Sequence, residues 1–165
     1  MAAAPSISTD YRPGLLGEIA RAHARYYAKH WGFGRFFETK VASEGAAFLD
    51  RMGAGDLCLS AWRGEDFAGS LIVDRHDPDA AEGWAHLRWF IVTERGGGLG
   101  GELMARATAF LDQHAAPCFL TTFKGLDPAR RLYEKHGFRL VDERPTTTWG
   151  ATVSEQRFER AGASP

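Results

Sequence analysis

Hydrophobic residues recur at helical spacing in three stretches of the chain. In the first stretch, over residues 14–31, Leu15, Ile19 and Tyr26 fall on one side of a helix, and a glycine follows Trp31. A glycine directly after the last periodic residue is a common end of a helix. The same spacing predicts two more helices, over residues 36–52 and 98–114. A fourth helix, over residues 128–136, is predicted from its boundaries, with Asp127 as N-cap, Pro128 in the first turn and Gly137 after the end.

Six shorter runs of apolar and aromatic residues are bounded by polar or glycine-containing segments, as is typical of strands. The polar segment Arg63–Asp66 joins the first two runs and predicts a hairpin. In the third run, alternation places His86, Arg88 and Phe90 on one face of the strand and the residues between them on the other. The predicted strands cover residues 57–62, 67–73, 84–92, 118–123, 138–143 and 152–159.

The order of these elements is α-α-β-β-β-α-β-α-β-β, with the later helices lying between strands. Such an order predicts one α/β domain with a mixed central sheet flanked by helices. No repeat, linker or low-complexity block divides the chain. We therefore expect a disordered tail over residues 1–10, a single domain over residues 11–160 and a frayed tail over residues 161–165.

The charge balance and the length of the apolar runs each argue against one class of partner. The 165 residues include 20 Lys and Arg against 21 Asp and Glu, so there is no basic excess of the kind that nucleic-acid binding requires. No apolar run approaches the ~20 residues that span a bilayer. The first residues, MAAAPSIST, lack the charged and apolar regions of a signal peptide. We expect neither a nucleic-acid partner nor a membrane partner.

Cysteine and histidine spacing suggests no metal site. Cys58 and Cys118 are sixty positions apart in apolar surroundings, and neither belongs to a CxxC motif. The six histidines show no HExxH or HxH spacing. Buried free thiols are typical of a reducing compartment, which indicates a cytoplasmic location.

The strongest local signal is the glycine-rich segment Arg95–Gly101, between the third predicted strand and the third predicted helix. Glycines leave backbone N–H groups uncovered, and a helix start adds N–H groups without partners, so this segment can cradle a phosphate. A P-loop needs Lys followed by Ser or Thr, whereas Glu102 stands here. A dinucleotide loop follows the first strand of its fold, and this segment follows the third. An acyl-coenzyme A loop, Arg/Gln-x-x-Gly-x-Gly/Ala, fits as Arg95, Gly98 and Gly100, with a ligand-free flexible turn as the alternative.

Three parts of the chain make it similar to the GCN5-related N-acetyltransferase (GNAT) family over residues 11–160. The strand ending at Val92 runs through the glycine-rich segment into an amphipathic helix, like the coenzyme A motif of that family. The segment Ala129–Phe138, with Tyr133 shortly before a Gly-Phe pair, is similar to the later helix of the family. Two helices and two strands precede both motifs, as the family layout requires.

More closely, the chain resembles the GNAT modules that are fused behind MarR-type winged-helix domains. Because the chain contains no winged-helix segment, we expect a free-standing version of such a module. The residues that carry this likeness are His23, Tyr27, Trp31-Gly32, His86–Val92, Trp149-Gly150 and Glu155–Phe158.

The resemblance implies an acyltransferase enzyme that passes an acetyl group from acetyl-CoA directly to an amine within a ternary complex. Tyr133 matches the general acid of the family. His86 occupies the place where many relatives carry a Glu base, so either His86 or a water chain is implied as the proton acceptor. A non-catalytic acyl-CoA-binding regulatory module and a protein or peptide N-acetyltransferase remain alternatives. The implied coenzyme A contacts are Phe90, Ile91, Val92, Arg95, Gly96, Gly97, Gly98, Leu99, Gly100 and Gly101.

The acceptor is expected to be a small amine, such as an amino acid or a drug-like amine. His23, Tyr27 and Trp31 are polar-tipped aromatic residues that could line its pocket or fill the core. Arg88 could clamp a substrate carboxylate, or it could form a salt bridge to an acidic neighbour such as Glu82. GNAT domains often pair through their sheets or last strands, so a homodimer is one assembly that the resemblance allows.

Overall fold

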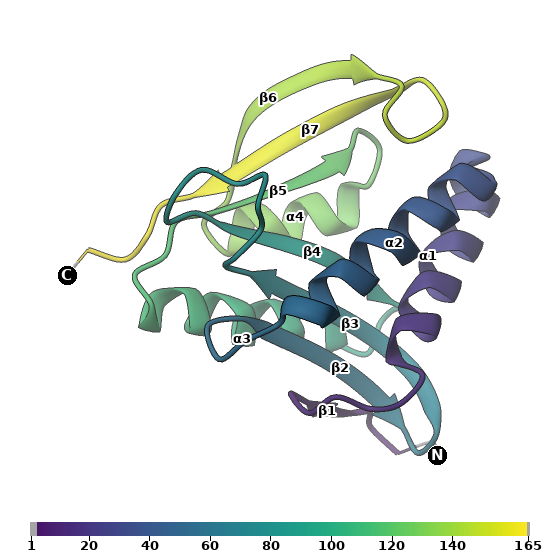
Figure 1. The fold of residues 1–165 in the computed structure, drawn as a ribbon, viewed down its shortest axis with the longest axis horizontal. Helices are drawn as coiled ribbons and strands as arrows, with labels where there is room; N and C mark the ends of the chain where they lie inside the picture. The colour runs from purple at the N-terminus through teal and green to yellow at the C-terminus, as the bar shows by residue number, and fades with distance from the viewer. Residues whose placement is uncertain (1–2, 165) are drawn as a thin grey trace.

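The computed structural model describes residues 3–164 and contains a seven-stranded sheet with two helices on each face (Figure 1). The strand order is β1-β2-β3-β4-β5-β7-β6, and only β4 and β5 run parallel. This architecture confirms the predicted mixed α/β fold. The elements are β1 (Ser6–Ser8), α1 (Leu15–Trp31), α2 (Arg35–Arg51), β2 (Leu57–Arg63), β3 (Asp66–Asp74), β4 (Ala85–Val92), α3 (Leu99–Gln113), β5 (Cys118–Phe123), α4 (Asp127–Lys135), β6 (Arg139–Thr146) and β7 (Val153–Arg160).

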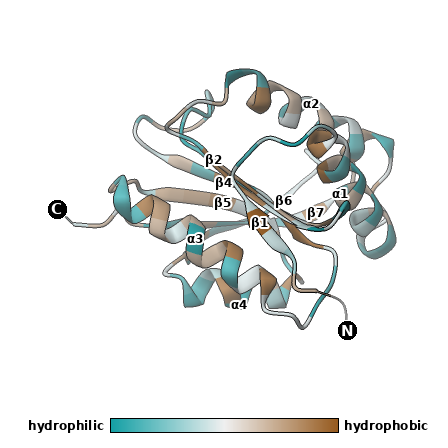
Figure 2. Ribbon diagram, turned by 90° about the horizontal axis from the view of Figure 1, so that it is seen from below, coloured by the Kyte–Doolittle hydropathy of each residue, from teal (hydrophilic) through white to brown (hydrophobic). Residues whose placement is uncertain are grey.

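The two helical layers bury separate hydrophobic clusters (Figure 2). One cluster lies under α3 and α4 and includes Leu103, Leu111 and Tyr133. The other lies under α1 and α2 and includes Leu15, Phe48 and several aromatic residues of the strands. Helices α1, α2 and α3 therefore each bury much of the apolar stripe that predicted them.

The N-terminal segment differs from the sequence-based expectation. Ser6–Ser8 pairs antiparallel with β2, so the expected disordered tail over residues 1–10 is wrong for these residues. At the other end, residues 161–164 have no regular secondary structure. Met1, Ala2 and Pro165, which belong to the two expected tails, lie outside the described residues.

A β-bulge in β4 overturns the predicted facing of Phe90. The register with β3 shifts because Ile72 pairs with Arg88 whereas Ser70 pairs with Ile91, which leaves two β4 residues opposite one β3 residue. Trp89, the first of the two, has a left-handed φ of 47°, and its carbonyl accepts a hydrogen bond of 2.7 Å from the Ser70 hydroxyl. Phe90 consequently turns away from Arg88 and packs on the α3–α4 side of the sheet.

Strands β4 and β5 separate soon after they begin. Only two residue pairs join them, Ala85 with Cys118 and His86 with Phe119, although each strand continues for at least four more residues. The sheet therefore opens between Arg88–Val92 on one side and Thr121–Phe123 on the other. This opening leaves backbone groups of β4 without a neighbouring strand on the β5 side.

None of the helices formed within residues 3–164 has both the length and the apolarity needed to cross a bilayer.

Candidate active site

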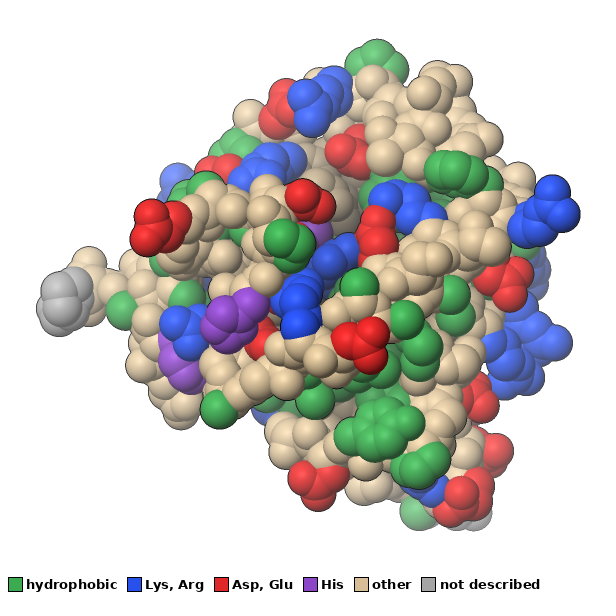
Figure 3. Space-filling model, viewed as in Figure 1, with side chains coloured by type: hydrophobic (Ala, Val, Ile, Leu, Met, Phe, Trp, Pro, Cys, Tyr) green, Lys and Arg blue, Asp and Glu red, His purple; other side chains and the backbone are tan. Residues whose placement is uncertain are grey.

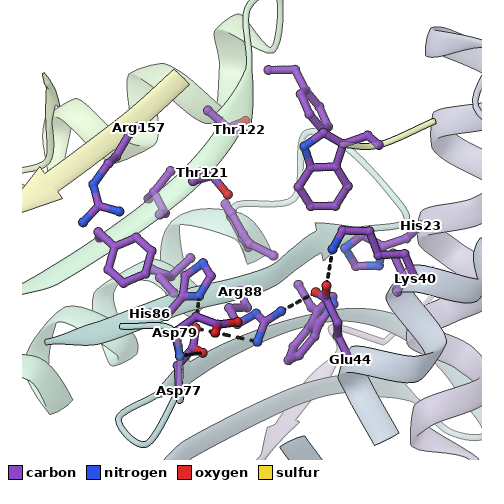
Figure 4. Close-up of a pocket in the computed structure, with 18 of the residues that line it drawn as sticks. His23, Lys40, Glu44, Asp77, Asp79, His86, Arg88, Thr121, Thr122 and Arg157 are labelled. Carbon is purple, nitrogen blue, oxygen red and sulfur yellow. Dashed lines mark hydrogen bonds and ion pairs between the residues drawn. The ribbon is translucent and has the colours of Figure 1, made fainter. Parts of the chain in front are cut away.

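A cavity of about 430 Å³ lies over the opening between β4 and β5, on the face of the sheet that α1 and α2 cover (Figure 4). The space-filling view shows charged side chains gathered around a hollow near the centre of one face (Figure 3). Aromatic and charged residues together make up most of the cavity wall. The aromatic lining residues are Tyr27, Phe37, Trp89, Phe90, Phe119, Phe123, Tyr133 and Trp149, and the charged ones are Lys40, Glu44, Arg51, Asp77, Asp79, Arg88 and Arg157.

Tyr133 of α4 reaches this cavity through the opening in the sheet. Its ring packs edge-on against Phe90, with 6.1 Å between the ring centroids, and it is only 6% exposed. Helix α4 begins with Asp127-Pro128, where the fixed φ of proline suits the first turn. Burial raises the pKa of the Tyr133 phenol above its usual value, and the nearby Thr122 hydroxyl offsets part of that rise. The phenol is therefore protonated at neutral pH and available as a proton donor.

His86 lines the same cavity and is held by a carboxylate that the sequence analysis did not single out. Its Nδ1 lies 2.6 Å from Oδ2 of Asp77, and its ring stacks on Phe119 with 4.2 Å between centroids. Burial lowers the pKa of His86, and the contact with Asp77 counteracts this effect. The hydrogen bond from His86 in turn holds the pKa of Asp77 well below its usual range. Asp77 belongs to the irregular β3–β4 loop, where no residue spacing could have indicated the contact.

Arg88 is surrounded by carboxylates of the protein itself. Its guanidinium forms an ion pair with Glu44 of α2 and lies 3.7 Å from Asp74 and 3.9 Å from Asp77. Of the two predicted roles, the salt bridge is the one present, with Glu44 as partner instead of Glu82. Because its positive charge is already compensated, Arg88 has little capacity left for a substrate carboxylate.

The candidate acceptor residues of α1 differ in their access to the cavity. His23 and Tyr27 line it, whereas Trp31 packs beside it against Phe33 and Phe123. Nδ1 of His23 donates to the Ile19 carbonyl at 2.8 Å, which leaves Nε2 as the acceptor nitrogen. Burial lowers the pKa of His23 to about 4, so this histidine is neutral at pH 7.

The glycine-rich segment joins β4 to α3 and is exposed to solvent. Gly96 and Gly98 have left-handed φ values of 88° and 76°, and Gly98 precedes α3 without any side chain capping the helix start. A Cβ added at Gly96, Gly97, Gly98 or Gly101 would meet open space. Gly100 differs, because its Cβ would lie 3.4 Å from Leu132, where α3 approaches α4 closely.

The open space around Gly96, Gly97, Gly98 and Gly101 leaves room for an anionic diphosphate to approach the backbone N–H groups of the segment. Arg95 begins the segment and contacts α1, where its Nη2 donates to the Tyr26 hydroxyl at 3.2 Å. Leu99 anchors the start of α3 by packing on the core. Upstream, Phe90, Ile91 and Val92 form the end of β4 where β5 has diverged.

Several cavity residues were not predicted from the sequence. Lys40, Asp77, Thr121 and Arg157 come from a helix, a loop and two strands that are distant along the chain. Only the fold brings them together, so periodicity and local motifs carry no signal for them. Within residues 3–164, no group of three or more His, Cys, Asp and Glu side chains is arranged to hold a metal ion.

Comparison with solved structures supports the fold assignment. A GNAT-family protein from Desulfovibrio desulfuricans aligns with a TM-score of 0.70 at 19% identity, over 97% of this chain and 100% of that one. The yncA protein from Salmonella typhimurium, solved with its cofactor acetyl-CoA, aligns with a TM-score of 0.75 at 13% identity, over 99% and 96% of the two chains. The ribosomal-protein-S18-alanine N-acetyltransferase from Escherichia coli aligns with a TM-score of 0.65 at 18% identity, over 98% and 96%.

At the level of sequence, no curated protein matches the chain significantly. The model of the acetyltransferase (GNAT) family, in contrast, matches residues 16–138, which is most of the chain. This matched range contains both the glycine-rich segment and Tyr133. The chain therefore belongs to the GNAT family of acetyltransferases.

Proposed function

We propose that this protein transfers an acetyl group from acetyl-CoA directly to the amine of a small molecule. The observation that carries the proposal is the opening between β4 and β5, which has the cavity over it, Tyr133 beside it and the glycine-rich segment shortly after the end of β4. A thioester lying in this opening would have its acyl carbon next to both an amine in the cavity and a proton donor. Both substrates can be bound at once, so no covalent acyl-enzyme is needed.

Coenzyme A would be held by backbone groups of two segments. The N–H groups of Arg95–Gly101 and the uncapped start of α3 suit the diphosphate, since both supply partial positive charge. The β4 backbone at Phe90–Val92 lacks a neighbouring strand on the β5 side and can pair with the amides of the pantetheine arm. An N–H group there can also polarise the thioester carbonyl. Bound acetyl-CoA supplies the activated acyl group. The yncA neighbour, whose cofactor is acetyl-CoA, supports this choice of donor.

Two side chains of the cavity would handle the protons of the reaction. His86 takes a proton from the acceptor so that a neutral amine attacks the acyl carbon. Tyr133 gives its phenolic proton to the departing thiolate, because burial keeps the phenol protonated.

A small acceptor suits the size and the charges of the cavity. Its volume of about 430 Å³ lies in the range of small-molecule sites. The charges of Lys40, Glu44 and Arg88 are largely compensated by one another, so the wall presents no strong acidic field for a polycation. Aromatic rings such as Phe37 and Trp149 favour an acceptor with an apolar or aromatic body.

The proposal is tested by mixing the protein with acetyl-CoA and a panel of amines while thiol release is followed. The panel holds aromatic and aliphatic primary amines, amino acids and short peptides with free N-termini. We expect thiol release with small amines, and a greater rate with phenethylamine than with a peptide. Faster release with peptides would favour acetylation of proteins, the activity of the Escherichia coli neighbour. Calorimetric binding of coenzyme A without thiol release for any amine would favour the non-catalytic module.

A further inference from the structure

The β3–β4 loop brings one nearly buried carboxylate against His86. The Asp77 side chain is 5% exposed and that of His86 is 15% exposed. One oxygen of Asp77 faces Nδ1 of His86 at 2.6 Å, and the other accepts a hydrogen bond of 3.0 Å from the backbone N–H of Asp79. Both oxygens are thus held in place, and the position of the carboxylate is fixed by its own loop.

This contact determines which nitrogen of His86 carries the proton. An ionised carboxylate can only accept, so Nδ1 of the neutral imidazole must carry the hydrogen, and Nε2 keeps its lone pair. Within residues 3–164, Nε2 of His86 has no hydrogen-bond partner. Stacking on Phe119, at an interplanar angle of 20°, fixes the plane of the ring.

The second histidine of the cavity lacks such support. His23 donates its Nδ1 hydrogen to a backbone carbonyl, and no carboxylate forms an ion pair with it within the described part of the chain. A proton on His23 would be a nearly buried charge without a counter-ion, which is costly. His86 differs, because a proton on Nε2 would create an imidazolium beside the carboxylate of Asp77.

We infer that Asp77 is a positioning residue of the reaction: it orients His86 and stabilises its imidazolium, so that Nε2 of His86 accepts the proton of the acceptor amine. The inference rests on the proposed function. It adds Asp77 to the site, specifies the tautomer of His86 and selects His86 over His23 as the proton acceptor. The other charged groups facing His86 are Arg88 of β4 and Asp74 of β3, while Arg157 of β7 lies over the ring of Phe119. Arg88 opposes protonation of His86, so Asp77 must outweigh it.

The proton balance of the step closes with these groups. The acceptor enters as an ammonium, its N–H bond breaks, and the proton passes to Nε2 of His86, which later releases it to solvent. The neutral amine forms a C–N bond with the acyl carbon as the C–S bond breaks, and Tyr133 protonates the thiolate. After the attack the nitrogen carries two hydrogens, one more than the amide needs. The extra proton passes through solvent to the Tyr133 phenolate and restores the phenol. One proton ends on sulfur and one in solvent, as the overall reaction requires.

The tautomer is tested first, without any acceptor. Nitrogen NMR of histidine-labelled protein, with His86 assigned through the His86→Gln variant, should show a protonated Nδ1 and an unprotonated Nε2 at neutral pH. In Asp77→Asn the pKa of His86 should fall, because the carboxylate that stabilises its imidazolium is gone. His76→Gln is the matched control. His76 belongs to the same loop and also contacts an aspartate, Asp56 at 2.9 Å, but it is 56% exposed and does not line the cavity.

The kinetic test uses acetyl-CoA with each panel amine that the wild-type protein acetylates, from about pH 5 to about pH 9. We expect Asp77→Asn to lower kcat at least ~10-fold and to move the acid limb of the pH profile to lower pH, with coenzyme A affinity unchanged. Asp77→Glu should recover part of the loss. His76→Gln should match the wild-type protein. The double variant Asp77→Asn/His86→Gln should be no slower than His86→Gln alone, because Asp77 acts through His86.

Three results would overturn the inference. The first is a His86 tautomer with Nε2 protonated, and the second is an Asp77→Asn variant with an unmoved pH profile. The third is additive loss in the double variant, which would show that Asp77 acts independently of His86. Failure of the proposed function is distinguishable, since it appears as absence of thiol release from the wild-type protein itself. That result would also remove the positioning role of Asp77 in the reaction, whatever the tautomer of His86.

Discussion

At the scale of single residues, Tyr133 gives the most direct test of the chemistry. Tyr133→Phe keeps the ring that packs on Phe90 and removes only the hydroxyl. We expect kcat to fall ~10²-fold, the usual contribution of a general acid, whereas the dissociation constant of coenzyme A stays the same. Steady-state kinetics with calorimetric titration of coenzyme A measure both quantities. Equal activity of the variant and the wild-type protein at all pH values would remove Tyr133 as the acid.

The glycine-rich segment offers a second test at a single residue. Gly97 has no left-handed φ and open space where a Cβ would stand, so Gly97→Ala should fold normally. The added methyl group projects from the surface that would receive the diphosphate, and we expect coenzyme A to bind ~10-fold more weakly, about 1.4 kcal/mol.

Gly53→Ala is the matched control for this substitution. Gly53 also has open space and no left-handed φ, but it lies between α2 and β2, away from the glycine-rich segment. Calorimetry on both variants separates the two sites. Equal affinities in Gly97→Ala, Gly53→Ala and the wild-type protein would show that the diphosphate binds elsewhere.

At the scale of helices and strands, the sequence predicted elements well where side-chain spacing alone decides them. Within residues 3–164, the four helices and six of the seven strands were predicted within three residues at each end. The three-residue strand β1 was missed, because so short a run forms only through its pairing with β2. The bulge at Trp89 was missed for a related reason: regular alternation assumes an unbroken register, and the shift depends on Ser70 in another strand.

The candidate site shows the same limit. Tyr133 and the glycines could be predicted because each belongs to a local motif with a recognisable spacing. His86 was predicted as a candidate proton acceptor, but its partner Asp77 was not predicted, because the contact depends on how an irregular loop folds back. Sequence patterns describe a residue's own element, whereas the cavity is made from side chains that six elements and two loops contribute.

The bulge itself can be tested through Ser70. Ser70→Ala removes the hydrogen bond to the Trp89 carbonyl and leaves a buried acceptor with one partner fewer, so we expect a loss of about 1–2 kcal/mol in the free energy of unfolding. Because the bulge turns Phe90 toward Tyr133, kcat should fall as well. Denaturant unfolding and steady-state kinetics give the two numbers.

Ser60→Ala controls for the loss of stability. Ser60 is also buried, and its hydroxyl accepts a 2.8 Å hydrogen bond from Trp62, but it belongs to β2 and does not line the cavity. We expect a similar change in unfolding free energy without a change in kcat. If both serine variants keep wild-type kcat, the bulge does not position the catalytic groups.

At the scale of the whole molecule, the proposed function uses both sides of the sheet. The glycine-rich segment joins β4 to α3, the cavity lies on the α1–α2 side, and the opening between β4 and β5 would bring coenzyme A next to the acceptor. The likeness to MarR-fused modules, the cytoplasmic location and a homodimer remain predictions from the sequence. Analytical ultracentrifugation would measure the oligomeric state.

Burial of neutral His23 links the stability of the whole fold to pH. Its pKa is about 4 in the folded protein, against an ordinary value of 6.5, so between these two pH values the unfolded chain binds more protons than the folded one. The contribution of neutral His23 to the free energy of unfolding is complete above about pH 6.5 and is lost as the pH falls toward about 4. The free energy of unfolding should therefore fall by up to about 1.4 kcal/mol per pH unit in this window because of His23 alone.

The slope of the unfolding free energy against pH separates the effect of His23 protonation from the contribution of His23 to packing. Replacing it in His23→Leu changes the stability at every pH, but we expect the slope between about pH 4 and about pH 6.5 to become shallower, since one group that must stay neutral is gone. His30→Gln, an exposed position on the same helix, is the matched control for removing a histidine. Urea unfolding at a series of pH values measures all three proteins. Equal slopes for His23→Leu and the wild-type protein would mean that His23 accepts a proton without unfolding. In that case His23 would share with His86 the capacity to receive a proton from an acceptor in the cavity.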